Sequence, residues 1–277
     1  MLFFLEDIPE NDYNITLATF AEHFKNTSGV FTVSSGKSFY DRVFPKDSID
    51  LGMCFNALHW LSAYPATLPG YNFASSYIDD ESRRDAWSTQ AKNDLAVFLR
   101  NRVEELRPGG HLLCQMRADQ FGETMEYSRA VACYIHNALK ARGLEKVAPY
   151  YRPNWFYRRT EDIEESIKEA NGGFKVVELG LHEKIRITTD AADIEKSREL
   201  AGLFADSWEV AVAECKKMRL QQYAPREAGR EVSDSEAAEI LTEVCKSMKD
   251  FFTKISHEEG RGIVFYNHVL HITKELK

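Results

Sequence analysis

The sequence predicts an α/β fold, in which a mostly parallel, helix-covered sheet carries a mainly helical cap. Up to Arg117, apolar runs and amphipathic stretches follow one another in the order strand, helix, strand, strand, helix, strand. This order is typical of a parallel sheet whose crossovers are helices. Beyond Arg117 the pattern is mostly helical. We therefore expect a core at residues 1–120 and a helical cap at residues 121–277, interleaved with the last core strands at about 173–187 and 262–274.

Short apolar runs predict the four strands of the core, because strands buried on both faces are continuously apolar. These strands are expected at residues 2–5, 29–33, 49–55 and 111–116. Apolar residues at helical spacing predict helices at residues 15–24 and 80–107. Asn11, Asp12 or Asn14 would cap the first helix. The second should stop at Pro108-Gly109-Gly110, a sequence that ends helices and makes tight turns.

In the second half, the mostly helical pattern predicts four helices, and two strand-like runs that follow glycines predict two late strands. The helices are expected at residues 127–142, 160–170, 194–220 and 233–255, and the strands at 174–179 and 263–273. A linker or mobile loop is expected at residues 224–232, where Pro225 and Gly229 stand among charges.

Composition excludes several classes of protein. A formal net charge of −8 argues against a nucleic-acid-binding protein, which would carry a basic patch. No apolar run has the length of a membrane span, and the opening residues lack the basic leader of a signal peptide. The five cysteines are widely spaced without a C-x-x-C pair, so we expect neither a metal site nor disulfides. A reducing compartment, the cytoplasm, is therefore expected.

Three candidate binding segments follow the carboxyl ends of strands, where open α/β sheets bind ligands. Asp7 ends the first strand, and a carboxylate there can accept hydrogen bonds from two ribose hydroxyls; alternatively it caps the following loop. Ser38 and Phe39 follow the second strand, where a hydroxyl and an aromatic ring suit a purine. His59 and Trp60 follow the third; they could contact a ligand, or be a packed tryptophan and a hydrogen-bonded histidine.

These segments resemble the plant-type SABATH family of S-adenosylmethionine (SAM)-dependent carboxyl methyltransferases. Leu5 to Asn14 is similar to the family's N-D-L-P-G-N-D-F-N, and Lys37 to Pro45 to its G-S-F-Y-x-R-L-F-P. Asn56 to Ser62 is similar to Y-S-L-H-W-L-S, and the L-R-P-G-G turn before the strand at 111–116 resembles a signature of class I methyltransferases. The similarity keeps its order and spacing to about residue 116 and is diffuse beyond.

The resemblance implies a Rossmann-like class I methyltransferase sheet, SAM as cofactor and a role for each matching residue. The cofactor would contact Asp7 through its ribose, Ile8, Ser38 and Phe39 through its adenine, and Phe55 at the end of its strand. The acceptor would contact Asn56, His59 and Trp60, with Asn56 in place of the family's tyrosine. We name no catalytic base and no metal ligand, because methyl transfer to a carboxylate depends mainly on alignment and desolvation.

One family feature is absent from the sequence: a first strand and a D-x-G-C-x-x-G-type loop, which precede the Asp7 segment in the family. In the family's strand order, 3-2-1-4-5-7-6, that strand is the central one, so its neighbours would be left with unpaired backbone groups. Three explanations are open. The chain is a fragment, its second and fourth family strands pair directly, or a partner chain supplies the strand.

The leading functional hypothesis is methyl transfer from SAM to a small-molecule acceptor, with a carboxylate as the favoured acceptor group. The expected partners are the small-molecule substrate and a second copy of the chain in a homodimer, with no nucleic acid and no membrane. The alternative is a catalytically inactive methyltransferase-like protein that binds a metabolite or a partner chain. Another nucleotide-dependent Rossmann enzyme is less favoured, because no dinucleotide fingerprint is present.

Overall fold

The computed structural model describes most of the chain. The described residues are 1–9, 11–68, 70, 74–77, 80–119, 123–187, 195, 199, 202, 213, 216–257 and 263–276. In chain order the strands are β1 (Leu2–Asp7), β2 (Phe31–Gly36), β3 (Ile49–Phe55), β4 (Leu106–Arg117), β5 (Phe174–Ile187) and β6 (Ile263–Lys274). The α-helices are α1 (Tyr13–Phe24), α2 (Glu81–Glu105), α3 (Glu123–Lys140), α4 (Thr160–Ala170) and α6 (Asp234–His257), and two short 3-10 helices are η1 (Ala74–Ser76) and η2 (Glu145–Tyr150).

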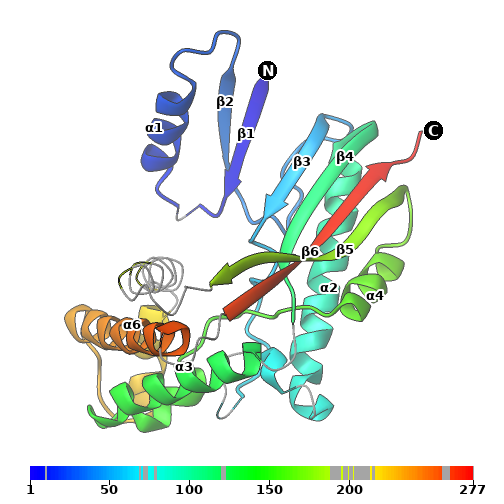
Figure 1. Cartoon of the computed structure of the whole chain (residues 1–277). Helices are drawn as coiled ribbons and strands as arrows, with labels where there is room; N and C mark the ends of the chain where they lie inside the picture. Colours follow the sequence, from blue (N-terminus) through cyan, green and yellow to red (C-terminus); the bar gives the residue numbers. More distant parts are fainter. Residues whose placement is uncertain are drawn as a thin grey trace.

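The strands form two sheets (Figure 1). β1 and β2 are a parallel pair, and the other four strands have the order β3-β4-β6-β5. β3 and β4 are parallel, whereas β6 is antiparallel to both β4 and β5. Within the described residues no ladder joins β1 to β3. The family's second and fourth strands therefore do not pair directly, and the interruption lies where the central strand was expected to be missing.

Local hydrogen bonds explain how the β1–β2 unit forms. The side chain of Asp12 accepts from the backbone N–H of Asn14 (3.0 Å) and caps α1, as one of the three predicted candidates. The Tyr13 hydroxyl, in the first turn of α1, lies 2.7 Å from the Asp7 carbonyl oxygen and 2.8 Å from that of Ser35. The start of α1 is thus tied to the carboxyl ends of both strands.

The junction between α2 and β4 differs from the prediction. β4 begins at Leu106, whereas the strand was expected at 111 after a turn. The pairing runs from Ile49 with Leu106 to Leu51 with His111, so the Pro-Gly-Gly segment is a bulge inside the ladder. Gly109 has φ +78°, and a Cβ on Gly110 would lie 2.9 Å from the Arg107 carbonyl oxygen. Both glycines are therefore needed by the bulge.

Helices α2 and α4 cover one face of the four-stranded sheet (Figure 1). Alternate residues of β4 and β6 point into this layer and are fully buried, in agreement with the period of two for strands. The buried strand residues are Leu106, Leu112, Cys114 and Met116 on β4, and Leu270 and Ile272 on β6. They pack against Leu95, Phe98 and Leu99 of α2 and Ile163 of α4. The helix at 160–170 thus belongs to the layer that covers the sheet.

A second core lies in the helical part below the sheet, where α3 and α6 pack together (Figure 1). The predicted helix at 194–220 falls largely outside the described residues, but residues 216–227 are helical. The linker expected at 224–232 is therefore wrong in its first half, and both Ala224 and Val232 are buried in this core. None of the helices in the described ranges has the length and apolarity needed to cross a membrane.

Candidate active site

The carboxyl end of β1 places Asp7 in solvent. One carboxylate oxygen of Asp7 accepts from the backbone N–H of Ile8 at 2.8 Å, so part of the predicted loop-capping role is present. The carbonyl oxygen of Asp7 accepts from the N–H of Lys37 at 2.9 Å, which brings the loop after β2 beside it. The remaining acceptor positions of the exposed carboxylate are open to a ligand. Ile8 is also exposed, at 47%.

The loop after β2 holds Ser38 and Phe39 beside α2. Ser38 Oγ accepts from the Tyr40 N–H at 3.3 Å, which closes a tight turn. The Phe39 ring is half-buried and packs on the rings of Tyr40 and Phe98, at centroid distances of 4.5 and 6.0 Å. Phe39 is thus partly a core residue, and one part of its ring remains accessible. The Tyr40 hydroxyl donates to the Trp60 carbonyl oxygen at 2.6 Å and connects this loop with the third predicted segment.

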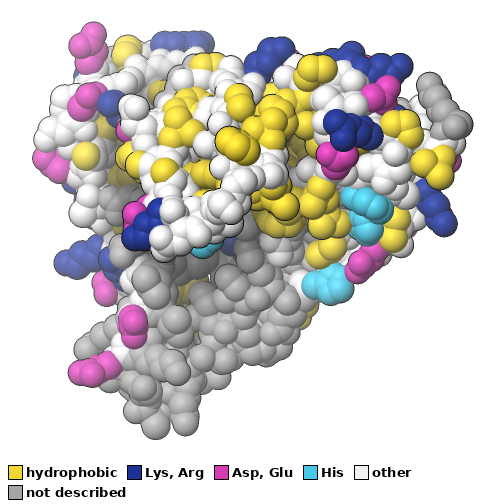
Figure 2. All heavy atoms as spheres, turned by 90° about the horizontal axis from the view of Figure 1, so that it is seen from above, with side chains coloured by type: hydrophobic (Ala, Val, Ile, Leu, Met, Phe, Trp, Pro, Cys, Tyr) yellow, Lys and Arg dark blue, Asp and Glu magenta, His cyan; other side chains and the backbone are white. Residues whose placement is uncertain are grey.

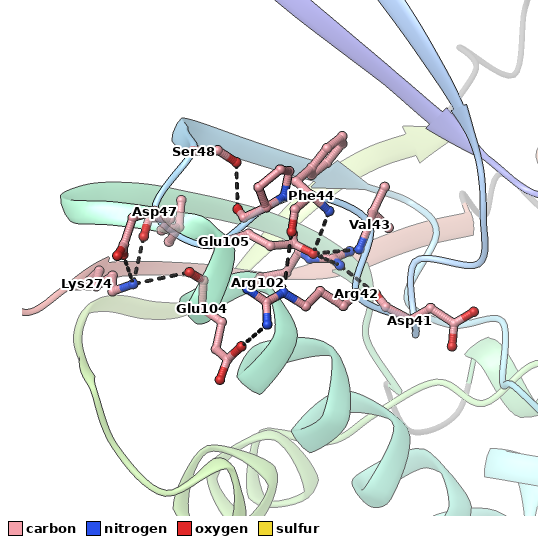
Figure 3. Close-up of polar contacts among 12 residues, drawn as sticks. Asp41, Arg42, Val43, Phe44, Asp47, Ser48, Arg102, Glu104, Glu105 and Lys274 are labelled. Carbon is pink, nitrogen blue, oxygen red and sulfur yellow. Dashed lines mark hydrogen bonds and ion pairs between the residues drawn. The ribbon is translucent and has the colours of Figure 1, made fainter.

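A buried ion pair at the end of α2 holds this loop (Figure 3). Arg102 donates to the carbonyl oxygen of Phe39 (3.0 Å). It also donates to the carbonyl oxygen of Asp41 (2.7 Å) and to the Glu105 carboxylate (2.8 Å). The same Glu105 oxygen accepts from the backbone N–H groups of Val43 (2.7 Å) and Phe44 (3.1 Å). Charge-assisted hydrogen bonds in a buried site are strong. The loop that carries Ser38 and Phe39 is therefore anchored to α2.

The end of β3 carries Phe55 and Asn56, and both are exposed. Phe55 is 54% exposed. Asn56 has φ +55°, a conformation that asparagine tolerates better than most residues. The Asn56 N–H donates to the Gln115 carbonyl oxygen at 2.8 Å, so the turn remains attached to β4. The asparagine thus suits the backbone at a position where the family carries tyrosine.

His59 and Trp60 belong to a cluster of four aromatic rings. The His59 ring lies 6.0 Å from that of Trp60, 5.3 Å from that of Trp155 and 5.9 Å from that of Tyr157, and Trp60 and Trp155 meet edge to face at 5.0 Å. His59 is buried, at 8% exposed, whereas Trp60 is half-buried. The predicted packing of the tryptophan is present, and the half-buried Trp60 gives the cluster an accessible side.

Backbone and side-chain contacts hold the His59–Trp60 segment against residues 155–158. The His59 carbonyl oxygen accepts from the Phe156 N–H at 2.9 Å, and Trp60 forms an isolated bridge with Trp155. Arg158, which is fully buried, donates to the carbonyl oxygens of Leu58 and Ala91. Burial raises the pKa of Tyr157 to about 12, so its hydroxyl stays protonated and can donate a hydrogen bond near neutral pH. The sequence prediction missed Trp155 and Tyr157, although the aromatic run Trp155-Phe156-Tyr157 was a visible signal.

The three segments lie at the same end of the strands. The loop after β2 is hydrogen-bonded to Asp7 through the Lys37 N–H (2.9 Å) and to Trp60 through the Tyr40 hydroxyl (2.6 Å). This loop therefore joins the carboxyl end of β1 to the segment that follows β3. Asp7 and Phe55 are therefore brought to one edge, with the His59–Trp60 segment following Phe55.

A cavity of about 460 Å³ lies elsewhere, between α3 and η2. Its walls include Arg129, Cys133 and His136 of α3 and Pro149 of η2, and none of the predicted site residues lines it. The candidate site is therefore an open edge of the sheet and not this cavity. Among the described residues, no group of three or more His, Cys, Asp and Glu side chains is placed to hold a metal ion.

Comparison with known proteins places this arrangement in one family. The sequence model described as "SAM dependent carboxyl methyltransferase" matches residues 1–255. Gibberellic acid methyltransferase 2 of Arabidopsis thaliana is 31% identical over 45% of this chain and 34% of its own length. Salicylate/benzoate carboxyl methyltransferase of the same plant is 29% identical over 64% of this chain and 50% of its own length. The chain thus spans about a third to a half of the length of these relatives.

The fold has a solved counterpart. A structure titled "Loganic acid methyltransferase with SAH" superposes with a TM-score of 0.69 at 20% identity, over 99% of this chain and 74% of the other. This likeness confirms the predicted Rossmann-like class I methyltransferase fold. The family model that matches residues 1–255 shows that the chain belongs to the SAM-dependent carboxyl methyltransferase family.

Proposed function

We propose that this chain transfers a methyl group from SAM to the carboxylate of a small molecule. The observation that carries the proposal is the family match over residues 1–255, which includes both Asp7 and the His59–Trp60 segment at one end of the strands. The names of the relatives support the acceptor class, since gibberellic, salicylic, benzoic and jasmonic acids are all carboxylic acids.

The residues at the edge of the sheet fit a nucleoside. Asp7 is exposed and has acceptor positions for two ribose hydroxyls, and Ile8 offers an apolar surface beside it. Ser38 and the accessible part of Phe39 are connected to Asp7 through the Lys37 N–H bond, so they can flank an adenine. Phe55 projects from the neighbouring strand end. When bound, SAM would supply a methyl group activated by its sulfonium.

The acceptor would lie against the His59–Trp60–Trp155–Tyr157 cluster, hereafter the aromatic cluster. Trp60 presents its accessible side to the acceptor, and Trp155 and Tyr157 hold Trp60 and His59 in place. His59, buried behind Trp60, would orient the carboxylate with a ring N–H. The packed rings of the cluster would shield one side of the reacting carboxylate from water, and alignment would contribute the larger part of the rate. Asn56, at the rim, would favour a more polar acceptor than a tyrosine does.

The direct test is transfer of labelled methyl from SAM to a panel of acids: benzoate, salicylate, jasmonate, gibberellic acid and loganic acid. We expect turnover with at least one of them. Trp60→Ala should lower kcat/KM by at least about tenfold, and the conservative Trp60→Phe should retain more. A chain that transfers no methyl group to any acid, while it remains folded, contradicts the proposal.

A second function, ligand binding without catalysis, is favoured by one observation. The candidate site is an open edge, and the described cavity lies in the cap away from the predicted residues. Such a protein would be stabilised against heat by a metabolite but would transfer no methyl group. Thermal-shift measurements with the same acids, run beside the transfer assay, separate the two functions.

We also propose that the protein works in the cytoplasm and as a homodimer. Three of the described cysteines, Cys54, Cys114 and Cys133, are free thiols, which suits a reducing compartment. Localisation of a tagged chain and sedimentation of the purified protein test the two statements. Secretion would contradict the first, and a strictly monomeric protein the second.

A further inference from the structure

Two histidines meet on the face of the four-stranded sheet that is opposite α2 and α4. Leu112 of β4 and Leu270 of β6 point into the layer with these helices, and the alternation of strands turns their neighbours His111 and His271 to the other face. His111 is exposed and His271 is half-buried, so an ion from solvent can reach both. In the view from above, histidine side chains lie beside the hydrophobic ones, next to acidic side chains (Figure 2).

The ring nitrogens of the two histidines face each other. His111 Nδ1 and His271 Nε2 are 3.0 Å apart, whereas the ring centroids are 5.2 Å apart, so the rings meet through their nitrogens and are not stacked. The ladder fixes this arrangement, because His111 is opposite Thr273 and His271 is opposite Leu113, which makes the histidines diagonal neighbours. Both strands are inner strands of the sheet, paired on both edges. The backbone therefore holds the pair in place.

Two imidazoles in this position can share a proton or a metal ion. Without metal, one ring donates its N–H to the facing nitrogen of the other. Neutral imidazole is also the commonest metal ligand among side chains. A tetrahedral zinc ion with Zn–N bonds of about 2.0–2.1 Å holds its nitrogens about 3.3–3.4 Å apart. A small tilt of the rings opens the present 3.0 Å to this span, and each proton then occupies the ring nitrogen that faces away.

An acidic side chain lies beside the pair. Glu178 of β5 is opposite His271 in the register of β5 and β6, and its carboxylate forms an ion pair with His182 (3.3 Å). The negative charge of Glu178 favours a cation at the neighbouring histidines. Among the described residues, no third His, Cys, Asp or Glu side chain is placed to complete a metal site. Water would therefore fill the remaining positions around the ion.

We propose that His111 and His271 together bind one Zn²⁺ ion and so link β4 to β6. Imidazole selects ions of this kind over Mg²⁺, which prefers oxygen ligands. The site departs from the expectation of no metal, which was based on the spacing of the cysteines. The histidines are 160 residues apart in the sequence, so no local motif could indicate them. His111 pairs with Leu51 near the start of β3, so the site is at the opposite end of the parallel strands from Phe55.

Calorimetric titration of the whole chain with zinc chloride measures the number of ions bound and their affinity, and a titration with magnesium chloride provides the comparison. We expect Zn²⁺ to bind and Mg²⁺ to give no heat of binding. His111→Gln and His271→Gln should each weaken one equivalent of Zn²⁺ by at least about tenfold, and the double variant should lose that equivalent. Zn²⁺ should also raise the melting temperature of the unaltered chain more than that of the double variant.

The matched control is a third histidine on the same sheet. The His182 side chain is 54% exposed and contacts Glu178, so His182→Gln removes an imidazole without removing a proposed ligand. It should change the affinity by less than about twofold. Nitrogen-15 NMR of the unaltered chain identifies the ligands without any substitution, because the ring nitrogens of His111 and His271 should shift when Zn²⁺ is added.

Several results would overturn this proposal. They are absence of Zn²⁺ binding, equal binding of Mg²⁺, an unchanged number of ions in the double variant, an equal loss in His182→Gln, or ring-nitrogen shifts at other histidines only. None of these readouts uses SAM or methyl transfer. Failure of the proposed enzymatic activity would therefore leave this result intact, and the reverse also holds.

Discussion

Replacing Glu105 by alanine should destabilise the protein far more than its position near the surface loops suggests. Glu105 is 1% exposed, and one of its oxygens accepts from Arg102 (2.8 Å) and from the N–H groups of Val43 (2.7 Å) and Phe44 (3.1 Å). The alanine variant leaves a buried guanidinium without its carboxylate and two amides without an acceptor. Removing one partner of a buried pair costs about 3–5 kcal/mol in the free energy of unfolding.

The adjacent residue provides the control. Glu104 forms an ion pair with Arg42 at 2.7 Å, but the two side chains are 58% and 44% exposed. Exposed pairs contribute about 0–1 kcal/mol, so Glu104→Ala should hardly change the unfolding free energy. Urea titrations followed by circular dichroism measure both variants, with the slope of the transition as a check that the unfolded states are comparable. Equal losses in the two variants would refute the reasoning.

Three further predictions follow from the same structure. Asn56→Gly should be neutral in urea titration, whereas Asn56→Tyr should cost about 1–2 kcal/mol because of the positive φ. Trp155→Phe should lower kcat/KM for an acid acceptor by about tenfold without abolishing folding, since Trp155 supports Trp60; an unchanged value would contradict that role. Burial raises the pKa of Asp119 from 3.8 to about 7, so the folded state keeps a proton that the unfolded state has lost. The stability contribution of Asp119 is therefore present below about pH 4 and falls as the pH rises to about 7, and Asp119→Asn should flatten this part of the profile.

The sequence predicts regular elements well where a single local pattern determines them. The apolar run at 49–55 is strand β3 to the residue, and α2 lies within the predicted helix. The start of β4 at Leu106 was not predicted, because the Pro-Gly-Gly segment is held in the ladder by its partner β3. A local sequence pattern does not show the conformation that a segment adopts because it pairs with a neighbouring strand.

The candidate site could be predicted only in part for the same reason. The sequence singles out Asp7, Ser38 and His59 as candidates because each follows an apolar run that ends at the edge of the sheet. Trp155 and Tyr157 come from a segment without regular structure, and they meet His59 only through contacts that are distant in sequence. The anchoring of Phe39 to α2 by Arg102 is likewise a long-range contact.

The central claim is that Asp7 holds the ribose of the cofactor. Calorimetric titration of the whole chain with S-adenosylhomocysteine tests it most directly, with Asp50→Ala as the control, an exposed acid at the opposite end of β3. We expect binding that is weaker by at least about tenfold in Asp7→Ala and unchanged in the control. No heat of binding to the intact chain, or equal affinity in both variants, would contradict the claim.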